Sequence, residues 1–222
     1  MNGMGKSVHS VNRFILAGEA GASGSSDAAS LIYDRQGNRK YLTAAERRAF
    51  LGSVRAMDDE VRTFGEVLAY SGARLSEVLA LTPARIDLSA RLVIVECLKK
   101  RRQGVFRAIP IPDQLLVQLN DVHKIGERQV RPELRRERLW PWCRTIAWMH
   151  IKKAMETAHV VGPQATPKGL RHAFAITALQ SGVPINLVRR WLGHSRLSTT
   201  EIYAEAVGPE EQALAALLWK TF

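Results

Sequence analysis

Apolar residues recur at helical spacing along most of the chain, with short polar turns between them. Near the start of this pattern, Thr43 is followed three positions later by Glu46, which is the spacing of a capping box. The apolar residues Phe50 and Val54 follow on one helical face. We therefore expect a helix to begin at Thr43.

The same period predicts further helices. Their expected ranges are 58–70, a short segment from residue 75, a segment from residue 113, 144–158, 168–180, 184–192, 199–206 and 210–219. The last four are separated by Gly182, Gly193 and Gly208, a residue type that suits the C-terminal end of a helix. The last third of the chain is thus expected to be wholly helical.

Two segments break the helical period. Residues 92–96 and 105–111 are rich in β-branched side chains and are separated by the basic sequence LKKRRQG. This arrangement predicts an antiparallel hairpin with a long basic turn. The expected fold class is α+β, mainly α-helical with a small antiparallel β-sheet.

The beginning of the chain has a different composition. Residues 18–30, GEAGASGSSDAAS, are small and polar and cannot bury enough apolar surface to repay the entropy of ordering. We expect residues 1–40 to form a flexible N-terminal arm or leader, and residues 41–222 to form one compact domain.

The charge of the chain indicates the kind of partner. There are 32 Lys and Arg residues against 21 Asp and Glu residues, a net charge of +11, and the isoelectric point is about 10.2. A surplus of this size suits a surface that binds polyphosphate. Ribosomal, RNA-binding and membrane-surface proteins share this property, so charge alone does not choose between them.

Other classes are disfavoured by what the sequence lacks. Cys97 and Cys143 are too far apart to form a CxxC pair, and the histidines are scattered without ligand spacing, so neither a disulfide framework nor a metal site is indicated. No apolar run reaches the roughly 18 residues that a membrane span needs. We expect a reduced, cytoplasmic protein without membrane contact.

Two arginines stand in local motifs that suit phosphate chemistry. Breaking a phosphodiester by direct attack needs a nucleophile, cationic donors for the non-bridging oxygens and an acid for the departing oxygen. Arginine serves the second task because its planar fork holds two phosphate oxygens and stays charged. Arg74 lies in GARLSEVLAL, directly after a helix-ending glycine, and Arg171 lies in LRHAFAITAL.

A histidine and a tyrosine follow near the end of the chain. His194 lies in WLGHS after a glycine, and Tyr203 follows nine residues later in STTEIYAEA. Ser198, with Glu201 in capping-box register, is expected to cap the helix that carries Tyr203. This spacing allows His194 and Tyr203 to face one site.

These blocks together resemble the catalytic domain of the tyrosine recombinase, or phage integrase, family. The motifs that carry the resemblance are GARLSEVLAL, the hairpin with LKK, LRHAFA and LGHSRLSTTEIYAE, over residues 41–205. The resemblance implies a site-specific recombinase with the catalytic-domain fold of that family. It would cleave and rejoin double-stranded DNA through a 3′-phosphotyrosyl intermediate. No metal or cofactor is implied, because the phosphotyrosyl bond stores the energy for religation.

The resemblance also assigns a role to each matching residue. Arg74 and Arg171 would clamp the phosphate, His194 would donate to it or stabilise the transition state, and Tyr203 would be the nucleophile.

The basic turn of the hairpin matches the position of the general acid. Lys99 matches the family's hairpin lysine, and Lys100 remains an alternative because this turn is longer than usual. Lys100, Arg101 and Arg102 are expected to contact DNA and to strengthen its salt-dependent binding.

Three further residues have family positions or plausible roles at the site. Lys168 stands where the family often has histidine, three residues before Arg171, and a lysine can donate to phosphate but is a poor base while protonated. We keep Lys168 as a catalytic residue and leave the base open. His172 is expected to make a secondary DNA contact and not to replace the missing base. Glu77 either holds an active-site residue in place or is an exposed helix charge.

The resemblance implies partners as well as chemistry. Synapsis in this family uses four protomers, so we expect a homotetramer on DNA recombination sites. We expect no separate core-binding domain before the catalytic one, and an accessory DNA-binding protein could supply the missing contacts. Two rivals remain: a nicking and closing enzyme like type IB topoisomerases, and a non-catalytic DNA-binding regulator derived from a recombinase.

Overall fold

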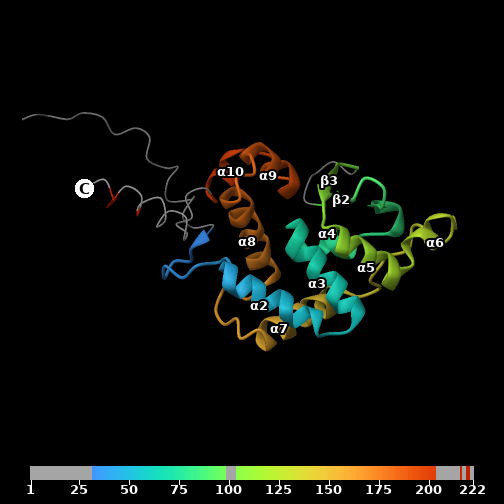
Figure 1. Cartoon of the computed structure of the whole chain (residues 1–222), viewed down its shortest axis with the longest axis horizontal. Helices are drawn as coiled ribbons and strands as arrows, with labels where there is room; N and C mark the ends of the chain where they lie inside the picture. Colours follow the sequence, from blue (N-terminus) through green and yellow to red (C-terminus); the bar gives the residue numbers. More distant parts are fainter. Residues whose placement is uncertain (1–31, 99–103, 204–215, 217–218, 221–222) are drawn as a thin grey trace, which may run out of the picture.

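The computed structural model describes residues 32–98, 104–203, 216 and 219–220, and it confirms a mainly helical fold with a small antiparallel sheet (Figure 1). Its helices are α2 (Ala44–Arg55), α3 (Asp59–Ser71), α4 (Leu75–Leu79), the 3-10 helix η1 (Pro83–Arg85), α5 (Asp113–His123), α6 (Ile125–Gln129), α7 (Arg144–Thr157), α8 (Pro167–Gln180), α9 (Ile185–Leu192) and α10 (Ser198–Glu201). Its strands are β1 (Ile86–Asp87), β2 (Leu92–Glu96) and β3 (Phe106–Pro110).

The start of α2 confirms the predicted capping box. The Thr43 hydroxyl accepts a hydrogen bond from the backbone N–H of Glu46 at 3.2 Å, and the Glu46 carboxylate accepts one from the backbone N–H of Thr43 at 2.8 Å. Arg39 also donates to this carboxylate, at 2.8 Å. The segment before α2 is therefore attached to the first turn of that helix.

Helix α3 lies at the centre of the larger core. Its buried face includes Phe64 and Leu68, and it packs against α2, α5 and α8. The helix ends at Gly72, whose backbone is left-handed with a φ of 60°. A side chain at this position would overlap the ring of Phe174 on α8, so only glycine allows the chain to turn here and continue to Arg74.

The sheet contains the predicted hairpin and one strand that was not predicted. Strand β2 pairs with β3 in antiparallel register, with Val93 opposite Ile109 and Val95 opposite Arg107. All four of these residues are buried, so β3 places an arginine on the inward face of the sheet. The third strand, β1, has two residues and is too short to produce a pattern in the sequence. The turn residues 99–103 lie outside the described part of the chain.

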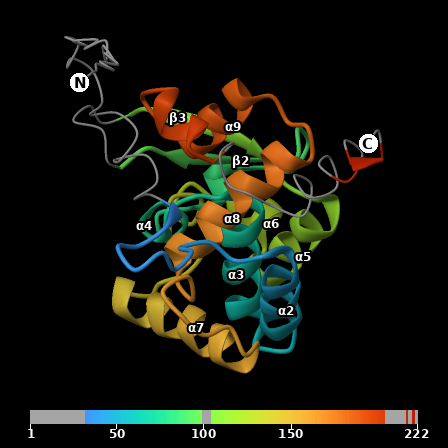
Figure 2. The same cartoon turned by 90° about the vertical axis from the view of Figure 1, so that its left-hand side faces the viewer.

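A second, smaller core holds the C-terminal helices together. It includes Phe174 and Ala175 of α8, Val188 of α9 and Tyr203, and Ile32 packs against them. Figure 2 shows α9 beside the strands, α8 in the middle of the molecule and α7 at the opposite side. The expected boundary of the domain near residue 41 stays a prediction, since residues 1–31 are not described.

One predicted cap is wrong. Ser198 is the first residue of α10, not its cap, and no side chain caps this helix. The preceding residue Leu197 already has helical backbone angles and accepts from the backbone N–H of Glu201, so the turn begins one residue earlier than expected. Within the described residues α10 ends at Glu201, and the predicted helix 210–219 lies almost entirely outside them.

Among the described residues, no helix has both the length and the apolar character that crossing a membrane would require.

We predict that Gly169→Ala lowers the free energy of unfolding by about 1–3 kcal/mol. Gly169 lies in the first turn of α8, and a Cβ atom there would overlap the backbone carbonyl oxygen of Gln164, which cannot move aside as a flexible side chain can. Gly52→Ala in α2 is the matched control. A Cβ atom at Gly52 meets nothing within 4 Å, so the better helix propensity of alanine should stabilise the protein by about 0.5–1 kcal/mol. Urea denaturation measures both effects, and an unchanged or more stable Gly169→Ala protein would contradict the prediction.

Candidate active site

Arg171 joins three separate parts of the fold. It lies on α8 and is 7% exposed. One terminal nitrogen of its guanidinium donates to the carbonyl oxygen of Gly72 at 2.7 Å, and the other donates to the carbonyl oxygen of Leu192 at 2.7 Å. The turn after α3 and the end of α9 are therefore held against α8 by one side chain.

His194 is fixed in position and in tautomer. Gly193, with a φ of 69°, ends α9 and turns the chain so that His194 faces Arg171. The Arg171 guanidinium, which can only donate, lies 3.1 Å from Nε2 of His194, so this nitrogen is an acceptor. Nδ1 therefore carries the hydrogen and donates to the Thr200 hydroxyl at 3.0 Å. Burial, and then the charges of Arg171 and Arg74, lower the pKa of His194 to about 3.

Arg74 is held by Glu77, and this settles the role of that carboxylate. Glu77 is 1% exposed, and its oxygens accept from both the backbone N–H and the guanidinium of Arg74, each at 2.8 Å. Burial by itself would raise the pKa of Glu77, but the hydrogen bonds and charges of Arg107 and Arg74 lower it. Glu77 is therefore an ionised residue that positions Arg74, and not an exposed helix charge.

Arg107 is the main residue that the sequence analysis missed. It donates to the Glu77 carboxylate at 2.6 Å and to the carbonyl oxygen of Trp191 at 2.6 Å. The alternation of β3 could have revealed it, because Arg107 and Ile109 fall on the same face of the predicted strand. Thr200 was also missed, since its contact with His194 depends on how α10 folds back.

Tyr203 lies beside these cations but is buried. It is 5% exposed, and its hydroxyl lies 2.9 Å from Nδ1 of His172. Its ring stacks on that of His194, with the ring centroids 6.1 Å apart and the planes 18° apart. Burial raises the pKa of Tyr203, although the charges of Arg171 and Arg74 oppose this effect. The hydroxyl is therefore protonated in this structure.

His172 is buried, and its hydrogen-bond partner is Tyr203. Burial, followed by the charges of Lys168 and Arg171, lowers the pKa of His172 to about 3, so the ring is neutral. Its Nε2 atom has no hydrogen-bond partner among the described residues. The structure thus brings His172 to the candidate nucleophile.

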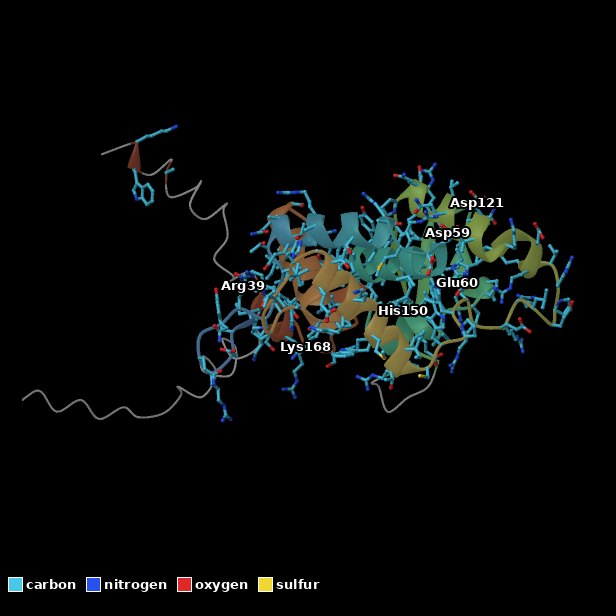
Figure 3. All side chains as sticks on the ribbon, turned by 90° about the horizontal axis from the view of Figure 1, so that it is seen from below. Arg39, Asp59, Glu60, Asp121, His150 and Lys168 are labelled. Carbon is cyan, nitrogen blue, oxygen red and sulfur yellow. The ribbon has the colours of Figure 1, made fainter. Side chains whose placement is uncertain are left out.

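The structure gives less information on the lysines of the candidate site than on its arginines and histidines. Lys168 is exposed in the first turn of α8, and in Figure 3 it lies toward the same end of the molecule as Arg39, away from Asp59 and Asp121. The candidate general acids and their basic neighbours lie outside the described residues; these are Lys99, Lys100, Arg101 and Arg102.

The assembled cluster suits an anion. Arg74 and Arg107 both donate to the Glu77 carboxylate, and Arg171 donates to backbone carbonyl oxygens instead. The formal charge of these four side chains is therefore 3 − 1 = +2. The two histidines add no charge. Among the described residues, no group of three or more His, Cys, Asp or Glu side chains could hold a metal ion.

We predict that the buried neutral histidine His172 makes the fold less stable in acid. Its pKa is about 3 in the fold against the usual 6.5, so the unfolded chain binds an additional proton between these values. The stabilisation of the fold that depends on an unprotonated His172 is present in full above pH 6.5 and is lost as the pH falls toward 3. In His172→Gln, the dependence of the unfolding free energy on pH should weaken by up to about 1.4 kcal/mol per pH unit in this window. Urea denaturation between pH 5 and pH 7 measures the difference, and equal slopes for the two proteins would contradict it.

Comparison with known proteins gives one consistent family. The profile of the Phage integrase family matches residues 40–207. "Tyrosine recombinase XerA" of Thermococcus onnurineus is 32% identical over 169 residues, which cover 75% of this chain and 58% of the relative. The chain therefore spans about three fifths of the length of this relative.

Solved structures share the fold. A XerH site-specific recombinase bound to palindromic difH substrate, in a post-cleavage complex, matches with a TM-score of 0.67 and 20% identity over 84% of this chain and 56% of the XerH chain. The catalytic domain of bacteriophage HP1 integrase matches with a TM-score of 0.57 and 22% identity, and the match covers 79% of this chain and 92% of that domain. The matched profile and the sequence relative show that the chain, whose fold brings Arg74, Arg171, His194 and Tyr203 together, belongs to the phage integrase family of tyrosine recombinases.

Proposed function

We propose that the chain is a site-specific DNA recombinase that cleaves and rejoins double-stranded DNA through a covalent link to Tyr203. The observation that carries this proposal is that the residues assigned to three different roles lie together at one site. Arg171 donates to His194, and the ring of Tyr203 lies on His194, so clamp, stabiliser and nucleophile are neighbours although they come from α8, the end of α9 and the turn after α10.

The reaction follows from these positions. The Tyr203 oxygen attacks the phosphorus, a bond forms between them, and the bond from phosphorus to the 5′ oxygen breaks. The negative charge that builds on the non-bridging oxygens is stabilised by the guanidiniums of Arg74 and Arg171. The departing 5′ oxygen takes a proton from Lys99 or Lys100. Attack of a 5′ hydroxyl on the phosphotyrosine reverses these steps and joins the strands.

Two protons must also be placed. Because Nδ1 of His172 lies within hydrogen-bond distance of the Tyr203 hydroxyl, we propose, contrary to the expectation from the sequence, that His172 accepts this proton. Nε2 of His194 needs a proton before it can donate to phosphate, because in this structure it accepts from Arg171. A bound phosphate anion favours both protonations, since it opposes the cations that lower the pKa of each histidine.

The relatives support a DNA substrate. The XerH structure is described as a complex with its difH substrate after cleavage, and the relatives in sequence are named tyrosine recombinases. We further propose a tetramer of this chain on two DNA sites, with Lys100, Arg101 and Arg102 contacting the DNA and Lys168 donating to a phosphate oxygen at the site. An accessory DNA-binding protein would add further contacts to the DNA.

We predict that Tyr203→Phe abolishes a covalent adduct that the native chain forms. A library of random-sequence duplexes is incubated with the protein, the DNA that remains attached under denaturing conditions is sequenced, and the recovered site is rebuilt as a nicked suicide duplex. Cleavage of this duplex releases a short strand, so the adduct accumulates and appears on a denaturing gel as a product heavier than 24.7 kDa. Tyr70→Phe is the control, because Tyr70 is a half-buried tyrosine bonded to Arg55.

The adduct experiment, together with a plasmid relaxation assay, distinguishes the proposed recombinase from the two rival functions. An adduct that forms equally with Tyr203→Phe would rule out this nucleophile. DNA binding without any adduct from the native chain would favour the non-catalytic regulator. Relaxation of a supercoiled plasmid that lacks the recovered site would favour a topoisomerase-like enzyme.

We predict that the general acid is identified by a change of leaving group. Replacing the bridging 5′ oxygen of the recovered duplex by sulfur gives a group that leaves without a proton. The variant that lacks the acid, Lys99→Ala or Lys100→Ala, should cleave normal DNA about 100-fold or more slowly and should recover most of its rate on the sulfur duplex. The other variant serves as the control. If neither variant is slowed on normal DNA, the acid is not in this turn.

A further inference from the structure

Arg107 connects the sheet to both sides of the candidate active site. We propose that Arg107 is a positioning residue for the reaction, which holds Arg74 through Glu77 and holds His194 through the end of α9. This inference rests on the proposed function, because it assigns Arg107 to the same cleavage reaction.

The contacts of Arg107 use all three of its guanidinium nitrogens. Exposed and buried residues alternate along β3, and the Arg107 side chain, at one of the buried positions, is 3% exposed. Nη2 donates to Glu77 of α4 at 2.6 Å, Nε donates to the carbonyl oxygen of Trp191 of α9 at 2.6 Å, and Nη1 lies 3.1 Å from the sulfur of Cys97. One buried cation therefore fixes three segments relative to β3.

The first of these contacts controls the charge that Arg74 can offer to phosphate. Both guanidiniums bind the same carboxylate, so the group of Arg74, Glu77 and Arg107 has a formal charge of 2 − 1 = +1. Without Arg107, Glu77 and Arg74 would form an isolated neutral pair. The Arg74 guanidinium would then be held by the carboxylate and would stabilise a developing negative charge less well.

The second contact controls the position of His194. Arg107 binds the carbonyl oxygen of Trp191, and Arg171 binds that of the next residue, Leu192, so two arginines hold adjacent carbonyls at the end of α9. The turn at Gly193 follows at once. A Cβ atom at Gly193 would come within 3.1 Å of the Cys97 sulfur and 3.2 Å of Nη1 of Arg107, which shows how closely this turn packs on the arginine.

The third contact lies at the base of the hairpin. Cys97 follows β2, and its backbone N–H donates to the carbonyl oxygen of Val105 at 2.8 Å. Residues 99–103, with the candidate general acids, are the segment between these two positions. Arg107 thereby holds the described ends of the hairpin against the segment that carries His194.

The surroundings of Arg107 make a chemical rescue feasible. Arg107 lines a cavity of about 470 Å³ that opens to solvent between the hairpin and α9. Removing its side chain would enlarge this cavity by the volume of a guanidinium group. A free guanidinium ion could enter and bind Glu77 and the Trp191 carbonyl oxygen.

We predict that Arg107→Ala cleaves the recovered suicide duplex about 100-fold more slowly than the native chain. Its non-covalent affinity for the intact duplex should stay within about threefold, because the Arg107 side chain is buried and its guanidinium nitrogens bind groups within the protein. Guanidinium chloride at tens of millimolar should restore the cleavage rate at least tenfold, and sodium chloride at the same ionic strength should not. Arg85→Ala is the matched control. Arg85 stacks on the exposed ring of Phe106 at 3.9 Å, beside Arg107, and its loss should neither slow cleavage nor create a response to guanidinium.

The outcomes are separable from those of the proposed function. If the native chain forms no adduct, the proposed function fails and this inference fails with it. If the native chain forms the adduct and Arg107→Ala is equally fast, or is slow without any rescue, only the role of Arg107 is overturned. Should Arg107→Ala not fold, Arg107→Lys keeps the charge but lacks the fork. Slow cleavage with normal DNA binding would then support the inference, and native cleavage would overturn it.

Discussion

The structure of the site depends on one buried cation, Arg171. Burial lowers the pKa of its guanidinium to about 10, which still leaves it charged at neutral pH. A buried charge is tolerated only where hydrogen bonds replace its hydration, and here the carbonyl oxygens of Gly72 and Leu192 provide them. Both carbonyls lie at helix ends, where backbone oxygens lack helical partners: one belongs to the left-handed Gly72, and the other precedes the left-handed Gly193. The ends of α3 and α9 thus lie together because the Arg171 guanidinium donates hydrogen bonds to carbonyl oxygens that have no helical donor.

The other charged groups follow from this arrangement. Two cations near Arg171 would repel one another without a counter-charge, and Glu77 supplies it from a buried position between Arg74 and Arg107. The histidines respond in the opposite way, because burial, and then the charges of cations that would attract a phosphate, lower the pKa of His172 and of His194 and keep both rings neutral. An anion entering the site therefore meets an excess of positive charge and two histidines whose proton affinity rises on its arrival.

Much of this fold follows from local patterns, and much of the site does not. The helices between residues 44 and 192, the hairpin strands and the capping box at Thr43 are properties of neighbouring residues, and the structure confirms them. The predicted helix 210–219 stays a prediction. The predicted cap at Ser198 is wrong because the spacing of a capping motif does not exclude a helical turn that begins one residue earlier. Arg107 and Thr200 were missed because their roles lie in distant contacts, such as the bond from Arg107 to Trp191, which no local pattern encodes. The roles of Lys99, Lys100 and Lys168 stay predictions.

The burial of Tyr203 bears on when its hydroxyl loses its proton during the reaction. A tyrosine hydroxyl that is buried and bonded to a neutral histidine is a weak nucleophile, because burial raises its pKa. The nearby guanidiniums of Arg74 and Arg171 oppose that effect, but a bound phosphate would partly neutralise them and favour the protonated hydroxyl further. Deprotonation in advance of attack is therefore disfavoured at both stages. The proton should leave Tyr203 for His172 only as the bond to phosphorus forms, when the negative charge passes from the tyrosine oxygen to the phosphate oxygens that the arginines hold.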